Sequence, residues 1–148
     1  MDIYDKSKRS EIMSKISGKD TKPEIIVRKY LFSKGFRYRI NDKRYPGKPD
    51  IVLPKYNTVI FVHGCFWHGH KNCKASNLPE TRKEFWEKKI GDNIKRDRKN
   101  NRKLKNDGWK VITIWQCEIN NQSKIESGLE KLIRELTSQY LKKNISYG

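Results

Sequence analysis

Two short apolar segments, Thr58-Val-Ile-Phe-Val62 and Lys110-Val-Ile-Thr-Ile-Trp115, decide the fold of this chain. Both are rich in β-branched and aromatic residues, which is typical of buried β-strands. Between them, residues 79–106 have the periodicity of one long helix, and Gly108 closes it. A strand, a crossover helix and a second strand form a right-handed unit. We therefore expect the two strands to run parallel. This unit also allows them to be neighbours in the sheet.

The flanking segments predict the remaining elements. Thr21-Lys-Pro-Glu24 is a capping box that opens a helix ending at Gly35. Phe36, Tyr38 and Ile40 alternate with arginines, as in a half-buried strand, and residues 50–53 predict a further strand joined to residues 58–62 by a turn. A last amphipathic helix carries the apolar residues Ile125, Leu129, Leu132, Ile133, Leu136 and Tyr140.

These elements predict an α/β fold in one domain over residues 1–148. Residues 1–18 form an N-terminal arm, in which residues 7–16 have a short helical pattern, and residues 19–148 form the core with its C-terminal helix. The arm has too little apolar surface for a core of its own. It either docks on a partner or packs against the rest of the chain.

The composition indicates a polyanionic partner. The 148 residues include 34 Lys and Arg against 17 Asp and Glu, a formal charge of +17, and aromatic residues make up 11%. Such a chain attracts nucleic acid and offers rings for base stacking. The alternatives are a basic protein whose charge serves solubility alone and a binder of the ribosomal type. We find no run of about 18 apolar residues and no signal segment, so we expect a cytoplasmic protein without a membrane partner.

All the cysteines and histidines lie in or beside one arrangement, His63-Gly-Cys-Phe-Trp-His-Gly-His-Lys-Asn-Cys73 together with Cys117. The spacing Cys65-x4-His70-x2-Cys73 suits structural zinc with a fourth ligand from elsewhere. Cys65 and Cys117 each follow the end of one of the two expected parallel strands, so they can meet in space. The alternative is three reduced cysteines that serve as small core residues. A zinc site would leave His63 and His68 free for chemistry.

Two carboxylates are candidates for the chemistry. Asp50 opens a strand after Pro49, a position used for the first Mg²⁺ ligand in phosphodiesterases, although an aspartate there is often only a turn residue. Asp97 lies on the inward stripe of an otherwise basic helix. It could orient a histidine, join the hydration shell of a metal, or form a structural salt bridge with a nearby arginine.

Several motifs together closely resemble the very short patch repair (Vsr) DNA mismatch endonucleases, from about residue 5 to residue 135. The run His63-Gly-Cys-Phe-Trp-His68 is the most specific of them. The others are Lys19-Asp-Thr21, Pro46-Gly-Lys-Pro-Asp50, Phe61-Val62, Phe85-Trp86, Lys89-Ile-Gly91, Arg96-Asp-Arg98, Gly108-Trp109 and Trp115-x-Cys117.

The resemblance implies roles for individual residues. Asp50 and the backbone carbonyl of Val62 match ligands of catalytic Mg²⁺, and His68 matches the base that activates water. His63, Asp97 and Glu24 match residues that support the hydrated metal and the phosphate, although the capping box by itself also explains Glu24. Cys65, His70, Cys73 and Cys117 match the zinc ligands. Phe66, Trp67 and Trp86 match aromatic residues that enter the duplex from the major groove, and Met13 matches an arm residue that enters from the minor groove; core packing is the alternative for Phe66 and Trp67.

The resemblance also implies a restriction-endonuclease-like fold, with a mixed sheet flanked by helices and a structural zinc site. The implied function is a nick in one strand of duplex DNA next to the thymine of a T:G mismatch, the lesion left by deaminated 5-methylcytosine. We expect a monomer that works at the nucleoid, with a functional link to a DNA cytosine-5 methyltransferase and to mismatch-repair proteins. The alternatives are a restriction-like nuclease without mismatch preference and a zinc-containing DNA-binding protein without catalysis.

Overall fold

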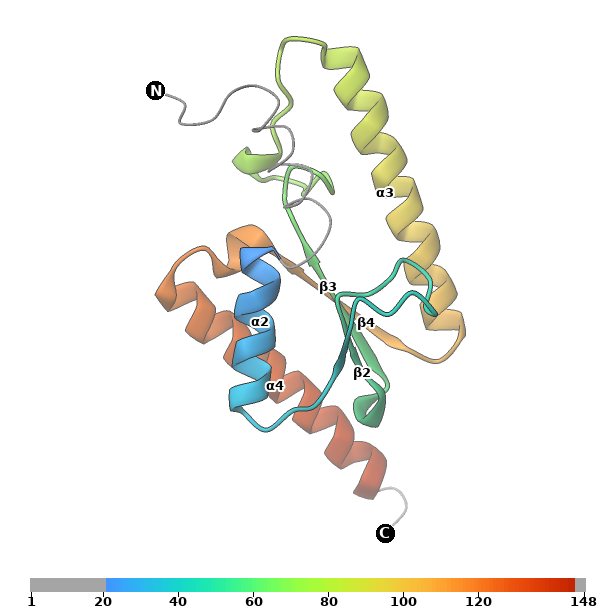
Figure 1. Ribbon diagram of the computed structural model, residues 1–148, viewed down its shortest axis with the longest axis vertical. Helices are drawn as coiled ribbons and strands as arrows, with labels where there is room; N and C mark the ends of the chain where they lie inside the picture. The colour runs from blue at the N-terminus through green and yellow to red at the C-terminus, as the bar shows by residue number, and fades with distance from the viewer. Residues whose placement is uncertain (1–20, 146–148) are drawn as a thin grey trace.

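One mixed four-stranded sheet organises the chain. The computed structural model describes residues 21–145, with side chains to residue 138 (Figure 1). Its strands are β1 (Arg39–Ile40), β2 (Ile51–Leu53), β3 (Thr58–His63) and β4 (Lys110–Trp115), in the spatial order β1-β2-β3-β4. The expected arm with Met13 lies outside the described residues, as does the side chain of Tyr140.

The pairing of the two central strands confirms the expectation from the sequence. β3 and β4 are adjacent and parallel, in a register that runs from Thr58 opposite Lys110 to His63 opposite Trp115. The other two pairs, β1 with β2 and β2 with β3, are antiparallel. The carboxyl ends of β3 and β4 therefore meet at the same edge of the sheet, where Cys65 and Cys117 follow.

Helices cover both faces of the sheet (Figure 1). α2 (Lys22–Ser33) and α4 (Gln122–Ile145) lie on one face, and α3 (Lys83–Asn106), the crossover between β3 and β4, lies on the other. Because side chains alternate along a strand, β3 supplies both cores. Ile60 and Val62 join the larger cluster with residues of α2 and α4, while Val59 and Phe61 pack with Leu104 of α3.

Two boundaries differ from the sequence predictions. The strand expected around Phe36–Ile40 is only two residues long, because Phe36 is buried against Tyr56, with ring centroids 5.2 Å apart, and does not pair in the sheet. The long helix begins at Lys83 and not at residue 79. Arg82 has a φ of 58°, a left-handed conformation that cannot belong to a right-handed helix.

Two glycine-containing loops lie close against α3. A Cβ on Gly69, which has a φ of 58°, would lie 2.6 Å from Cδ1 of Ile94. A Cβ on Gly47, with a φ of 76°, would lie 3.0 Å from Cβ of Asn100. Only glycine combines this backbone conformation with so close an approach. The loops that follow His68 and precede Asp50 are thus both positioned by the same helix.

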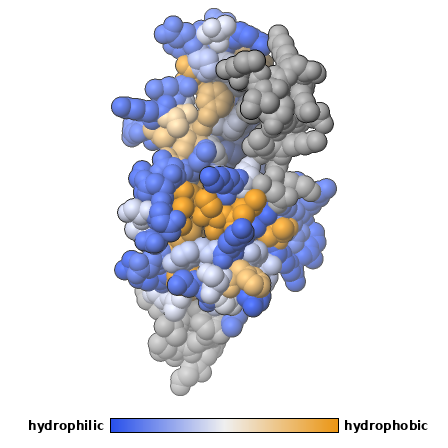
Figure 2. Space-filling model, turned by 60° about the vertical axis from the view of Figure 1, so that its left-hand side comes forward, coloured by the Kyte–Doolittle hydropathy of each residue, from blue (hydrophilic) through white to orange (hydrophobic). Residues whose placement is uncertain are grey.

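The surface is mostly hydrophilic, and Figure 2 shows one apolar patch at mid-height on the face turned forward there. On α2, Ile25 and Phe32 are exposed, at 37% and 57% of their surface, and lie seven residues apart on one side of the helix. In the described part of the chain, no helix combines the length and the apolar character needed to cross a bilayer.

Candidate functional site

A cleft of about 920 Å³ brings together all five side chains that the sequence marks as catalytic candidates. They come from separate elements and line the cleft together with Val62, and they are Glu24, Asp50, His63, His68 and Asp97. Basic side chains also line it, namely Lys22, Lys43, Lys48 and Arg96. The cleft therefore combines carboxylates and imidazoles with cations that can hold a phosphate backbone.

Asp50 lies directly before β2 and reaches across to the neighbouring strand. Its Oδ2 accepts a hydrogen bond of 2.6 Å from the backbone N–H of Val62. Burial raises the pKa of Asp50 to about 7, and the nearby carboxylate of Glu24 also raises it. Two carboxylates crowded together in a half-buried cleft fit a divalent cation, because a cation would remove both the repulsion and the burial cost. Asp50 is therefore more than a turn residue.

Glu24 has a buried carboxylate with its own cationic partner. The backbone N–H of Glu24 donates to Oγ1 of the N-cap residue Thr21 over 3.5 Å, which confirms this half of the capping box. The carboxylate is bound elsewhere, since Nη2 of Arg28 donates to its Oε2 over 2.9 Å. Helix capping thus explains the backbone of Glu24 but not why its acidic group is buried beside Asp50.

His68 and Asp97 form a close pair across the cleft. His68 Nδ1 lies 2.6 Å from Oδ2 of Asp97, on α3. Burial alone would raise the pKa of Asp97, but the hydrogen bond and the charges of His68 and His63 outweigh it and lower that pKa. Arg96 lies farther away, at 3.6 Å from Asp97 Oδ1. The main partner of Asp97 is therefore His68, and its ion pair with Arg96 is the weaker interaction.

His63 stacks face to face on His68. The ring centroids are 3.7 Å apart and the planes are inclined by only 3°. Burial and, to a smaller extent, the neighbouring His68 together lower the pKa of His63 to about 4, although Asp97 acts in the opposite direction. His63 is therefore a neutral imidazole at physiological pH. Together with Asp97, the two rings place three potential ligand atoms within 4.8 Å of one another.

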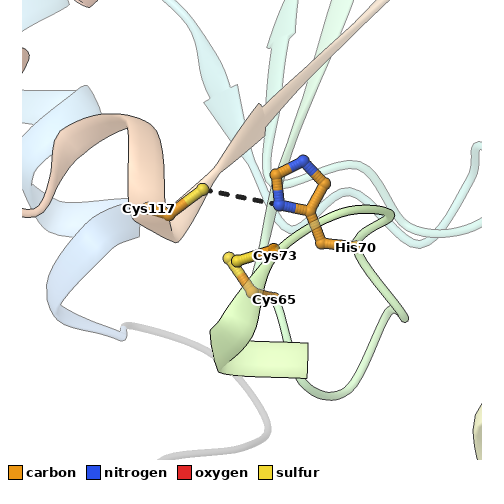
Figure 3. A group of neighbouring side chains, drawn as sticks. All are labelled: Cys65, His70, Cys73 and Cys117. Carbon is orange, nitrogen blue, oxygen red and sulfur yellow. Dashed lines mark hydrogen bonds between the residues drawn. The ribbon is translucent and has the colours of Figure 1, made fainter. Parts of the chain in front are cut away.

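The four residues predicted as zinc ligands converge at the carboxyl ends of β3 and β4. One donor atom from each lies within 4.8 Å of the others, and Figure 3 shows the side chains pointing toward one another. Cys65 follows β3, Cys117 lies in the 3-10 turn after β4 (Gln116–Ile119), and His70 and Cys73 belong to the intervening loop. His70 Nδ1 is 3.4 Å from Cys117 Sγ.

This donor set fits a divalent ion of tetrahedral preference. Small movements of the three sulfur atoms and the imidazole nitrogen toward a common centre would bring each to a zinc–ligand distance of about 2.0–2.3 Å. Burial, together with Cys65 and Cys73, raises the pKa of Cys117 to about 12, because thiolates this close repel one another. A bound cation would reverse that balance. The four residues could therefore hold a metal ion, and the convergence of all their donor atoms is not required by core packing of the cysteines.

The aromatic residues expected to contact DNA form a cluster of their own. Phe66, Trp67 and Trp86 contact one another edge to face, with centroid distances of 5.3–5.7 Å. Trp67 is 37% exposed, and none of the three belongs to either buried core cluster. Trp67 is also in the wall of the cleft. Core packing does not account for this cluster, which leaves a ring exposed beside the candidate catalytic residues.

The structure adds residues that sequence reasoning missed. Arg28 was not singled out, although it lies four residues after Glu24 on α2, a spacing that signals a helical ion pair. Asn100 lines the cleft three residues after Asp97 on the same helix face. Trp115 contacts the rings of both His63 and His70. Only the strand register and the loop path reveal that last contact.

Comparison with known proteins gives a consistent result. A family model described as DNA mismatch endonuclease Vsr matches residues 1–75. The type II nicking enzyme V.NmeAIP of Neisseria meningitidis is 53% identical over 135 residues, which cover 91% of this chain and 96% of that protein. The DNA mismatch endonuclease Vsr of Escherichia coli is 41% identical, over 84% of this chain and 79% of that protein.

A third relative, the type II nicking enzyme V.XorIIP of Xanthomonas oryzae, is 41% identical over 85% of this chain and 92% of its own length. A basic cleft with carboxylates and imidazoles, and relatives of this kind, define the protein as a DNA endonuclease. Within that class, the chain belongs to the Vsr family of DNA mismatch endonucleases.

The Cys/His cluster generates a prediction about metal content. Replacement of Cys73 by Ala should abolish stoichiometric zinc in the purified protein and lower the free energy of unfolding by roughly 3 kcal/mol or more, because the loop loses its anchor. Elemental analysis and urea denaturation measure the two effects. Lys71→Ala, an exposed change in the same loop, should keep the parent's zinc. Full zinc content in the Cys73 variant would contradict the assignment.

The burial of Asp50 generates a prediction about pH and stability. Because its folded-state pKa of about 7 exceeds the ordinary 3.8, the folded state holds the proton more tightly, and stability falls as pH rises between these values. Without divalent cations, Asp50→Asn should remove that slope and be more stable than the parent at pH 8 by roughly 2 kcal/mol. Denaturation curves over pH 4–8 test this, and the exposed change Asp107→Asn serves as a control. Parallel pH profiles for parent and Asp50→Asn would refute it.

Proposed function

We propose that this protein nicks one strand of duplex DNA next to the thymine of a T:G mismatch that arises from deaminated 5-methylcytosine. The observation that carries the proposal is the single cleft in which Asp50 and Glu24 face the His63, His68 and Asp97 group, beside a partly exposed aromatic cluster. Membership of the Vsr family supports it, as does the name of the Escherichia coli relative.

His68 is the proposed general base. Asp97 is ionised at neutral pH and lies at hydrogen-bonding distance from His68 Nδ1, so in the neutral ring the proposed place of the proton is Nδ1 and Nε2 is the free acceptor. Nε2 takes a proton from the attacking water, and the P–O bond to the leaving oxygen breaks as the water adds to phosphorus. The neutral ring of His63 packs on His68 and keeps a second positive charge away from it. This geometry supports the proposed roles of both histidines.

Asp50 and the backbone carbonyl of Val62 are the proposed holders of a magnesium ion. The carboxylate of Asp50 is already fixed toward β3 by the Val62 amide, and Glu24 adds a second acidic group beside it. When bound, magnesium would stabilise the negative charge that develops on the phosphate oxygens. The Cys65, His70, Cys73 and Cys117 cluster is the proposed structural zinc site, which holds the loop that carries His68 and the aromatic residues.

Phe66, Trp67 and Trp86 are the proposed contacts with the mismatched base step. A ring inserted between bases costs stacking energy in the DNA, and stacking on the protein returns about 1–3 kcal/mol per base. The loop of Trp67 is held to α3 by Asn93, whose side-chain amide donates to the Trp67 carbonyl over 3.0 Å. Met13, outside the described residues, is proposed to approach from the minor groove.

We further propose that the protein acts as a monomer at the nucleoid, on a restriction-endonuclease-like scaffold. The lesion exists only where cytosine has been methylated, so a DNA cytosine-5 methyltransferase must act before this enzyme. A nick must be processed and resealed, which requires repair proteins afterwards. The +17 charge of the chain supports residence on DNA.

A nicking assay tests the proposed reaction. With magnesium, the parent protein should nick a T:G duplex and leave the matched C:G and T:A duplexes intact. Asp50→Asn should lose the activity by about 10³-fold or more and still bind the duplex, because it removes the metal-binding charge but keeps the side-chain shape. Asp107→Asn, an exposed change at the end of α3, should nick like the parent. Equal nicking of matched DNA would favour a nuclease without mismatch preference, and binding without any nicking would favour a non-catalytic protein.

The aromatic cluster generates a separate prediction about mismatch preference. Mismatch preference can be expressed as the ratio of the nicking rate on T:G DNA to the affinity for a matched duplex. Trp67→Ala should lower this ratio by about 5- to 150-fold, which corresponds to one lost stacking contact of about 1–3 kcal/mol. Phe32→Ala removes another exposed aromatic ring, on α2, and should leave that ratio unchanged. Competition binding and single-turnover nicking measure the two terms. A Trp67 variant with full preference would exclude the stacking role.

A further inference from the structure

A continuous column of rings connects the catalytic cleft with the Cys/His cluster. It begins with the His68–His63 stack at 3.7 Å. His63 then meets Trp115 edge to face, at 5.2 Å and 75°, and Trp115 stacks flat on His70, at 4.1 Å and 10°. One indole thus lies between a proposed catalytic imidazole and a proposed metal ligand.

The sheet register places Trp115 in this position. Trp115 is the residue of β4 directly opposite His63 of β3 in the parallel pair, so both side chains project from the same face of the sheet. The backbone of Trp115 is also anchored, because its N–H donates to Oε1 of Glu118 over 2.9 Å. Glu118 follows Cys117 in the 3-10 turn, so the indole and the cluster share one rigid corner.

His63 depends on this packing for its orientation. Its ring is 6% exposed, and among the described residues Nδ1 of His63 has no hydrogen-bond partner. Histidines that act in catalysis or on metals are usually oriented by a hydrogen bond to their second nitrogen. In His63, ring contacts with His68, Trp115 and Phe61 orient the imidazole in place of such a hydrogen bond.

Trp115 is not accounted for by the cores. It is half-buried and belongs to neither of the two buried apolar clusters, unlike Ile114 beside it in β4. An indole whose ring contacts are two histidines adds little to apolar packing. It is therefore better explained by what it does to the imidazoles.

We propose that Trp115 is a positioning residue that couples the Cys/His cluster to the His63–His68 pair. The flat contact with His70 fixes the indole when the cluster is formed, and its edge holds the ring of His63 against His68. Trp115 is not among the residues that line the cleft. The inference rests on the proposed nicking function for its catalytic consequence, but the coupling itself is a property of the protein alone.

Substitution of Trp115 tests the coupling by activity. Trp115→Leu should keep the zinc content and the affinity for the T:G duplex, and reduce the single-turnover nicking rate by about 10- to 100-fold, as supporting residues of a site typically do. Trp115→Phe retains a ring and should restore most of the rate. Phe36→Leu, which removes a buried ring from the distant core, controls for general destabilisation and should nick at the parent's rate. Equal rates for the Leu variant and the parent would overturn the proposal.

Imidazole resonances test the coupling without activity. The chain has three histidines, so their ring signals can be assigned individually by nuclear magnetic resonance. In the parent, chelation of the cluster metal should shift the His63 signals, and in Trp115→Leu the shift should be clearly smaller, because only the route through the loop that carries His68 remains. Should the parent fail to nick T:G DNA, the proposed function fails while this measurement still decides the coupling. His63 signals that respond to chelation equally in both proteins, or a loss of zinc from both Trp115 variants, would refute it.

Discussion

The parallel pairing of β3 with β4 is the constraint on which both candidate sites depend. It brings the two strand ends together, so that Cys65 and Cys117 meet although a whole helix separates them in the chain. The same register sets His63 opposite Trp115. A shift of one residue would turn every side chain of β4 to the other face of the sheet, and the buried apolar residues on both faces resist that shift.

α3 is the second constraint, because the loop around Gly69 and the loop around Gly47 both pack against it. Asp97 of α3 pairs with His68. Ile90 and Ile94 contact the loop at Gly69, and Asn100 contacts the loop at Gly47. The helix therefore sets the distance between the loop that carries the histidines and the loop that carries Asp50. Rigid elements of this kind position reacting groups more accurately than loops can do alone.

The electrostatics of the molecule work on two length scales. The net charge of +17 acts at long range and favours approach to DNA. Inside the cleft, Asp50 and Glu24 concentrate negative charge where a phosphate must come close, and burial makes that charge costly. Glu24 already has Arg28 as a partner, whereas a bound cation would favour the ionised form of Asp50, so metal binding and DNA binding are expected to be linked.

Periodicity and spacing were sufficient for the strands at residues 58–63 and 110–115, for the inward position of Asp97 and for the Cys/His set, because each depends on short-range pattern or on which strand ends adjoin. The same patterns overstated β1 and the start of α3, where the burial of Phe36 and the backbone of Arg82 prevail over local alternation. The approach of Glu24 to Asp50, the His63–His68 stack and the place of Trp115 were settled by tertiary structure alone. They arise from side chains that different elements bring into one volume, and no local pattern in a chain encodes which of its distant neighbours will share that volume.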